Sequence, residues 1–297
     1  MESGINNRKV KKYDISSAYV ELTCFEDEFE DEVELADVFV DDSIVWIGGD
    51  AGSGKTTFLR WVAICSAKND FESVKNIRNS IPIVIGLRSK KNWPLNLNVL
   101  VNEFSKSFGY ECPSGWLENI INDNKAVILL DGLDEITEDK RTEVFDFVEN
   151  LSAKHPRIKI LLTARNSVEN ELNCFCRRYE ISPMNMENIK KFIFYWHRAV
   201  LYSEAIVEDR KIRALQNNLI AKITQTSSLK LLARNPLLCA MICALNFVNN
   251  EHLPENKMEL YESCCKMLID ARDAERNVER PDYVFIQQLD YSKKREY

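Results

Sequence analysis

Short apolar segments alternate with amphipathic ones over residues 41–183. Four segments are predicted strands because they are rich in aliphatic residues, as in IPIVIGL and AVILL: 44–47, 81–87, 126–130 and 158–162. Residues 179–181 are predicted to form one more strand. The segments between them repeat apolar residues at helical spacing and are predicted helices: 55–68, 97–108, 114–121 (with Ser114 as its N-cap) and 139–153. Apolar strands alternating with helices are typical of a parallel sheet covered on both faces. The pattern therefore predicts an α/β domain over residues 41–183.

After residue 183 the predicted strands stop and helical spacing takes over. One predicted helical face carries Ile189, Phe192, Ile193, Trp196 and Val200. Further along, Asn235 is a predicted N-cap with Pro236 in the first helical position, where the missing N–H has no intrahelical partner to lose. Asn256 and Glu259 form a capping-box pattern at the start of a later helix. Residues 184–278 are therefore predicted to form an all-α domain.

The first 40 residues are predicted to be an N-terminal extension. Within it, residues 17–24 alternate between apolar and polar positions, as a first strand would. Residues 26–42 contain ten carboxylates and no basic residue. A segment of this charge is usually solvated, so a surface location is expected for it.

The composition is that of a globular protein and argues against several functional classes. The 297 residues are 45% hydrophobic, and the formal net charge of −7 argues against a broad contact with a nucleic-acid backbone. No uncharged run reaches the ~20 apolar residues that a membrane span needs. The nine cysteines are odd in number and lack paired CxxC motifs. This usage favours a reducing, cytoplasmic location over a disulfide framework or a zinc ribbon.

Residues 49–56, GDAGSGKT, match the phosphate-binding pattern GxxxxGK[ST]. Glycines let the backbone N–H groups point at phosphate oxygens, Lys55 can reach the outer phosphates, and the Thr56 hydroxyl can join the shell of a Mg²⁺ ion. An ordinary glycine turn is the alternative, but an apolar strand before the motif and a helix after it favour nucleotide binding. The predicted contacts come from Gly49, Asp50, Ala51, Gly52, Ser53, Gly54, Lys55, Thr56 and Thr57.

A group of acids, in the sequence DGLDE, follows the predicted strand 126–130. A carboxylate at the carboxyl end of a buried strand holds Mg²⁺ in P-loop proteins, so Asp131 is the predicted metal ligand beside Thr56. Asp134 and Glu135 lie within reach of a water near a γ-phosphate and are candidate catalytic groups. The alternative, that they are acids favoured at the start of a helix, stays open.

Arg165 follows the predicted strand 158–162 in the sequence TAR. A cation at the carboxyl end of a neighbouring strand can contact the γ-phosphate, and this makes Arg165 the fourth candidate catalytic residue. A simple surface charge is the alternative.

The motifs GDAGSGKTT, VILLDGLDE, ILLTAR and RNPLL, in that order, resemble the bacterial branch of the NACHT family of signal-transduction P-loop ATPases. The resemblance covers roughly residues 15–291, and DGLDE is its most specific part. It implies an additional strand between the P-loop strand and the strand of the Mg²⁺ acid, which is the arrangement that would place Arg165 as a sensor. It also implies that Pro236 packs on the adenine, with Tyr19 and Val20 on the opposite side.

In function, the resemblance implies a switch in which exchange of ADP for ATP permits oligomerisation. The cofactors would be ATP or ADP with Mg²⁺, the activity a weak ATPase, and the partners other copies of the chain or a larger signalling protein. Bacterial members resemble antiviral defence sensors. The family's large N-terminal effector and C-terminal sensor are not seen, and residues 279–297 look like the start of a truncated winged-helix region. A fragment or split form is therefore expected.

Two other functional classes are weighed against this one. A GTPase would carry an NKxD motif, but the pairs Asn124-Lys125 and Asn256-Lys257 lack its Asp. A nucleotide kinase would carry a group of arginines in a lid, and none is seen. A catalytically inactive ATP-binding scaffold is the third possibility, and turnover by the purified chain would distinguish it.

Overall fold

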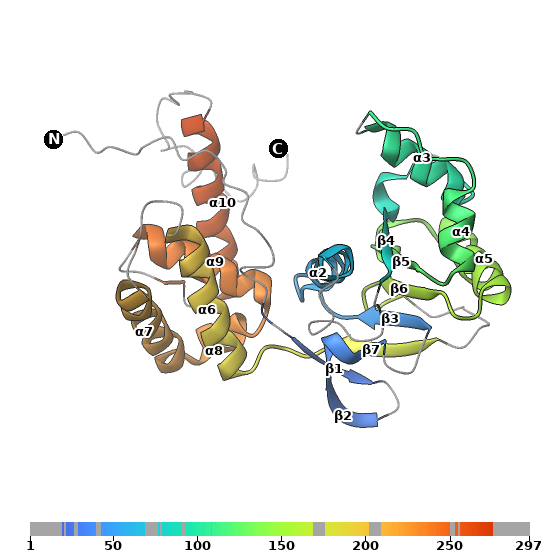
Figure 1. Cartoon of the computed structure of the whole chain (residues 1–297). Helices are drawn as coiled ribbons and strands as arrows, with labels where there is room; N and C mark the ends of the chain where they lie inside the picture. Colours follow the sequence, from blue (N-terminus) through green and yellow to red (C-terminus); the bar gives the residue numbers. More distant parts are fainter. Residues whose placement is uncertain are drawn as a thin grey trace, which may run out of the picture.

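A computed structural model describes two units that lie side by side, an α/β unit and a helical unit (Figure 1). The described residues are 20, 22–26, 29–39, 43–68, 77, 79–90, 93–107, 109–168, 176–201, 209–249, 253–254 and 256–275.

The α/β unit is built on a seven-stranded sheet with the order β2-β1-β7-β3-β6-β5-β4. The strands are β1 (Thr23–Glu26), β2 (Phe29–Glu34), β3 (Ile44–Gly48), β4 (Ile81–Gly86), β5 (Ala126–Asp131), β6 (Lys159–Thr163) and β7 (Arg177–Ile181). The five strands from β7 to β4 are parallel, and β1 and β2 add an antiparallel edge. Strand β6 lies between β3 and β5, so the prediction of an additional strand at this place is confirmed.

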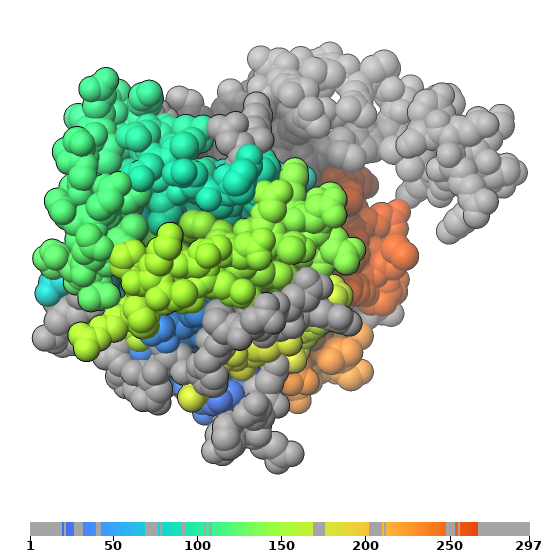
Figure 2. Space-filling view, turned by 90° about the vertical axis from the view of Figure 1, so that its right-hand side faces the viewer, coloured from blue at the N-terminus to red at the C-terminus, as the bar shows by residue number. Residues whose placement is uncertain are grey.

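Helices cover both faces of the sheet, because its central strands are apolar on both sides. The helices of this unit are α2 (Lys55–Lys68), α3 (Leu97–Ser107), α4 (Trp116–Asn122) and α5 (Glu138–Lys154). On one face, Phe58 and Val62 of α2 pack with Ile47 of β3. On the other face, Trp46 of β3 stacks on Phe145 of α5, with ring centroids 6.2 Å apart. Figure 2 views the molecule from the side that α5, α3 and α4 cover.

The helical unit contains α6 (Met186–Leu201), α7 (Asp209–Gln225), α8 (Ser227–Ala233), α9 (Pro236–Asn249) and α10 (Lys257–Glu275). Its buried residues, such as Ile193 and Ile242, belong to the same apolar core as α2, so the two units share one core. The fold class predicted from the sequence, a P-loop-type α/β sheet followed by an all-α unit, is confirmed. In the part of the chain that the structure describes, no helix is both long and apolar enough to span a bilayer.

Two predicted caps of the helical unit are present. The Oδ1 atom of Asn235 accepts hydrogen bonds from the backbone N–H groups of Leu237 and Leu238, at 3.0 and 3.2 Å. At the start of α10, the Glu259 N–H donates to Oδ1 of Asn256 at 3.0 Å, as in a capping box, while Oε1 of Glu259 accepts from the Asn256 side-chain amide at 2.8 Å. Short polar side chains next to an apolar run therefore located these two helix starts correctly.

The acidic segment 26–42 differs from its prediction as a solvated surface segment. It contains β2, whose Glu32 and Glu34 are exposed, followed by a 3₁₀ turn at Leu35–Asp37. Four apolar residues after β2 are buried in the shared core: Leu35, Ala36, Val38 and Phe39. The carboxylates dominate the composition of the segment, but they occupy positions that leave these four residues free to face the core.

The start of α4 also differs from its prediction. The helix begins at Trp116 and its N-cap is Gly115, at a φ of 74°, with no side-chain capping bond. A glycine adopts this left-handed conformation without strain, so the chain enters the helix without using Ser114. Helix α8 was not predicted. The expectations for Tyr19, for half of residues 17–24 and for residues 279–297 lie outside the described residues.

Leu129→Ala is expected to lower the free energy of unfolding by about 2–5 kcal/mol, because it leaves a cavity in the centre of the sheet. Leu129 is fully buried in β5, between β6 and β4. Urea denaturation followed by circular dichroism measures the change. Val84→Ala on the edge strand β4, where the side chain is 49% exposed, is the control and should change the free energy by less than about 1 kcal/mol. Equal losses in the two variants would contradict the described core.

Candidate nucleotide-binding site

The loop between β3 and α2 has the backbone conformation that a phosphate-binding loop requires. Gly52 and Gly54 have φ angles of +78° and +106°, in the region that L side chains avoid. The N–H of Ser53 bonds back to the carbonyl of Asp50 at 3.2 Å, and α2 begins directly after the loop. The glycines therefore let the chain curl tightly in front of the helix N-terminus, where an anion is favoured.

Lys55 lies at the first position of α2 and its ammonium group reaches back across this loop. Its Nζ atom donates to the carbonyl oxygens of Gly49 and Asp50, at 2.6 and 2.8 Å. Burial lowers the pKa of Lys55; among the nearby charges, Asp134 acts most strongly and raises it, while Arg165 lowers it. A partly desolvated ammonium that is held by carbonyl oxygens is well placed to receive an anion.

Asp131 connects three elements at the carboxyl edge of the sheet. Its Oδ1 atom accepts hydrogen bonds from the Thr56 hydroxyl of α2, at 3.0 Å, and from the Thr163 hydroxyl of β6, at 2.8 Å. The Thr163 oxygen in turn accepts the N–H of Gly132, at 3.0 Å. Hydroxyl and carboxylate oxygens are the donors that a hard divalent cation prefers, so Thr56 and Asp131 fit the predicted Mg²⁺ site.

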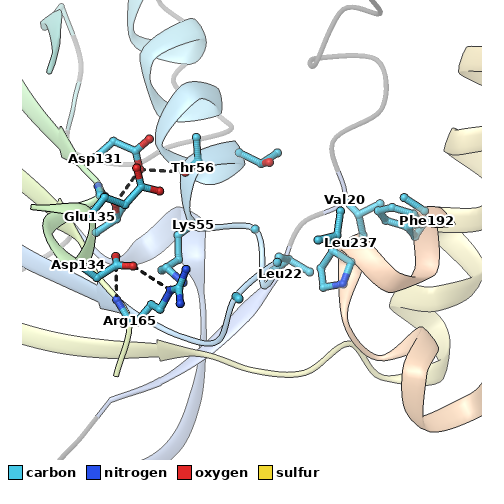
Figure 3. A pocket seen from close by; sticks show the side chains of 18 residues that line it. Val20, Leu22, Lys55, Thr56, Asp131, Asp134, Glu135, Arg165, Phe192 and Leu237 are labelled. Atoms are coloured by element: carbon cyan, nitrogen blue, oxygen red, sulfur yellow. Dashed lines mark hydrogen bonds and ion pairs between the residues drawn. The ribbon is translucent and has the colours of Figure 1, made fainter. Parts of the chain in front are cut away.

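The other two acids of the DGLDE motif have different surroundings. They lie in a 3₁₀ turn at Leu133–Glu135, and Asp134 pairs with Arg165 from the loop after β6 (Figure 3). The Arg165 Nε atom is 2.8 Å from Oδ2 of Asp134, and the Arg165 backbone N–H donates to Oδ1 at 3.2 Å. The Glu135 side chain is 41% exposed, and its Oε2 atom lies 3.8 Å from Arg88. Of the two acids, Asp134 is thus the more tightly held.

The helical unit contacts the phosphate-binding loop through the first turn of α9. The Asn235 side chain donates to the carbonyl of Ala51 at 3.0 Å, and the Leu237 N–H donates to the carbonyl of Gly52 at 3.3 Å. A Cβ atom added to Gly52 would lie 2.7 Å from the Cβ of Leu237, closer than real Cβ atoms approach. Glycine at this position therefore serves both the loop conformation and the contact between the units.

These elements enclose a cavity of about 550 Å³, within the usual range for a small-molecule site. One end is polar and the other is apolar, and the apolar end includes Val20, Leu22, Phe192 and Leu237 (Figure 3). The complete lining is Val20, Leu22, Ala51, Gly52, Gly54, Lys55, Thr56, Thr57, Asp131, Gly132, Asp134, Glu135, Thr163, Arg165, Phe192, Pro236, Leu237 and Ala240.

Most of the residues singled out in the sequence meet in this cavity. Gly49, Asp50 and Ser53 do not line it and instead shape the loop behind it. The sequence analysis missed Leu22, Gly132, Thr163, Phe192, Leu237 and Ala240 as lining residues. Thr163 could have been found as the polar residue that ends β6 beside β5, since parallel strands end at one edge. Phe192 lies in a segment whose apolar residues have helical spacing. Such spacing does not indicate which part of the molecule the helix packs against.

A β3-loop-α2 phosphate site, with Asp131 at the end of β5 and β6 between these strands, defines a P-loop NTPase. The chain belongs to the NACHT family: the NACHT domain matches residues 43–200, more than half of the sequence. It is 22% identical over 234 residues to NLR family CARD domain-containing protein 4 of Xenopus tropicalis, in a match that covers 76% of this chain and 21% of that protein. The chain therefore spans about a fifth of the length of this curated relative.

Solved structures with a similar fold include two archaeal ATPases. The Walker-type ATPase of Pyrococcus abyssi matches at 12% identity with a TM-score of 0.48, over 81% of this chain and 73% of that one. A signal transduction ATPase with numerous domains (STAND) and a tetratricopeptide repeat sensor, from Pyrococcus horikoshii, matches at 14% identity with a TM-score of 0.37. That match covers 76% of this chain and 30% of the other.

Lys55→Ala is expected to weaken nucleotide binding roughly 10- to 150-fold, because a charge-assisted contact to phosphate contributes about 1.5–3 kcal/mol. Titration with a fluorescent adenine nucleotide measures the affinity. Lys230→Ala, which removes an exposed lysine from α8, is the control and should bind as the parent does. A folded Lys55→Ala variant with the parent's affinity would mean that the nucleotide binds elsewhere.

Proposed function

We propose that this chain is the ATP-binding, slowly hydrolysing switch module of a NACHT-type signalling protein. The observation that carries the proposal is a single cavity with a polar end, built by the phosphate loop and strand ends, and an apolar end, to which the helical unit contributes. A nucleotide bound there contacts both units. The presence of this nucleotide, and the number of phosphates that it carries, then control how the two units are held together.

The polar end suits a nucleotide triphosphate with Mg²⁺. Lys55 and the N–H groups of the loop bind the phosphates, and Thr56 and Asp131 hold the metal ion. A bound Mg²⁺ would neutralise charge on the phosphate oxygens and so favour transfer of the γ-phosphoryl group to water, with ADP as the leaving group. The Thr163 hydroxyl holds the Asp131 carboxylate in place, at 2.8 Å from its Oδ1 atom.

Hydrolysis requires a group that orients water and accepts its proton, and Glu135 suits this role best. Its carboxylate borders the cavity, is 41% exposed, and has only a long contact to Arg88. Asp131 is already held by two hydroxyls, and Asp134 by Arg165. Glu135 therefore supplies the carboxylate that water can reach.

The apolar end suits a purine base, and adenine is the base that we propose. Pro236 and Leu237 form one wall, and Phe192 and Val20 lie at the same end of the cavity. Rigid apolar surfaces stack on the flat faces of a base without selecting its polar edge. The apolar side chains at this end offer no hydrogen-bond partner to the polar edge of a base. Guanine has more polar groups on that edge than adenine, so its burial costs more, and the sequence also lacks the NKxD motif that would select guanine.

The setting of this switch is also part of the proposal. We place the module in a cytoplasmic signalling or antiviral defence protein, in which it assembles with other copies or with a larger partner. Membership of the NACHT family supports the signalling role. Among the described residues, Cys24, Cys239 and Cys243 are thiols that form no disulfide, which is consistent with a reducing compartment.

Adenine nucleotides are expected to displace a fluorescent ATP analogue at lower concentration than guanine nucleotides do, because the base site is apolar and lacks a group that would select guanine. Competition titrations with ATP, ADP, GTP and GDP in the presence of Mg²⁺ measure this. Equal displacement by ATP and GTP would rule out the proposed base site.

Glu135→Gln is expected to keep Mg-ATP bound while slowing hydrolysis by about 10²–10⁴-fold, since a neutral amide cannot accept the proton of the attacking water. Single-turnover rates and binding isotherms on the same preparation separate the two properties. Glu138→Gln removes an exposed acid from the first turn of α5 and is the matched control, expected to hydrolyse at the parent's rate. A Glu135→Gln variant as fast as the parent would refute the catalytic role, and a parent without turnover would favour a binding scaffold.

A further inference from the structure

The two acids that end the DGLDE motif differ in their partners, although they are neighbours in sequence. The side chain of Asp134 is 11% exposed and uses both of its oxygens on Arg165. The side chain of Glu135 is 41% exposed and approaches Arg88, which is itself 80% exposed, at 3.8 Å. The first contact is a short, partly buried ion pair with a backbone hydrogen bond beside it, and the second is a loose surface pair. The two acids are therefore not equivalent groups.

Asp134 also lies close to both cations that line the polar end of the cavity. Both Lys55 and Arg165 line that end, and Figure 3 shows their side chains close to Asp134. Among the charges around Lys55, Asp134 is the one that most strongly favours the protonated ammonium. One carboxylate thus stabilises both positive charges of the site, in the way that a bound phosphate would.

We propose that Asp134 is a positioning residue that holds Arg165 when no γ-phosphate is present and so reduces the preference of the site for ATP over ADP. This inference rests on the proposed function, because it concerns the same nucleotide. It assigns to Asp134 a role distinct from that of Glu135, which orients water. The restraint acts through Arg165 and not through contact with the reacting atoms.

The physical reason is competition for one guanidinium group. Arginine presents planar N–H donors that pair with a carboxylate or with a phosphate, and those engaged with Asp134 must be released before they bind a γ-phosphate. Only ATP offers this phosphate, so the energy of the Asp134–Arg165 pair is subtracted from the binding of ATP and not from that of ADP. A partly exposed pair of this kind changes an equilibrium by about two- to fivefold.

Asp134→Asn tests this with little change of shape. The amide keeps an oxygen that accepts the Arg165 backbone N–H but removes the charge that holds the guanidinium. Dissociation constants for ADP and for a non-hydrolysable ATP analogue, both with Mg²⁺, are measured for the parent and the variant. The ratio of the ADP constant to the ATP-analogue constant is expected to rise about two- to fivefold, because ATP binding tightens. Asp134→Glu, which restores the carboxylate, should return the ratio toward that of the parent.

Two further variants separate positioning from a general electrostatic or structural effect. Glu138→Gln removes an exposed carboxylate four residues away, in the first turn of α5 and outside the cavity lining, and its ratio is expected to equal that of the parent. In an Arg165→Ala background, Asp134→Asn should no longer change the ratio. An unchanged ratio in Asp134→Asn, an equal rise in Glu138→Gln, or a rise that persists without Arg165 would each overturn the inference. A parent that binds neither nucleotide would instead overturn the proposed function, and this inference with it.

Discussion

The contact between the phosphate-binding loop and the start of α9 is the constraint on which the site depends. At Gly52 the backbone has a left-handed φ and its carbonyl accepts the N–H of Leu237, while Asn235 reaches the neighbouring carbonyl of Ala51. A Cβ atom on Gly52 would occupy the space of Leu237. Because only a glycine satisfies both the loop and this contact, one residue connects phosphate binding to the position of the helical unit.

Around this contact, the charged groups of the site form a network of hydrogen bonds and ion pairs with one another and with neighbouring polar groups of the chain. Lys55 is held by two carbonyl oxygens, Asp131 by two hydroxyls, and Arg165 by Asp134. Groups that would be costly to leave unpaired in a half-buried cavity are thus paired within the chain. Under the proposed function, a nucleotide would replace several of these contacts with its own, and the balance between the two sets would determine the response to the number of phosphates.

Much of the fold was predicted from the periodicity of apolar residues. The prediction failed where the charged composition of a segment obscured its pattern of apolar positions. The parallel strands and the helix after the phosphate loop were predicted because their apolar runs are long and uninterrupted. The acidic segment 26–42 was expected at the surface, yet Leu35 and Phe39 within it are fully buried. A count of charges does not reveal which positions face inward, and that depends on the sheet edge against which the segment packs.

For the site, the sequence by itself determined the phosphate loop, Asp131 and Arg165, since each is specified by residue types next to one strand end. Tertiary structure alone decided which of these groups touch. The Thr56–Asp131, Asp134–Arg165 and Asn235–Ala51 bonds join residues 75, 31 and 184 positions apart. Such pairings underlie the separate roles that we propose for Asp134 and Glu135. They also determine that Thr163, Phe192 and Leu237 line the cavity. Local pattern carries no information about them, because strand order and the packing of the two units set the distances.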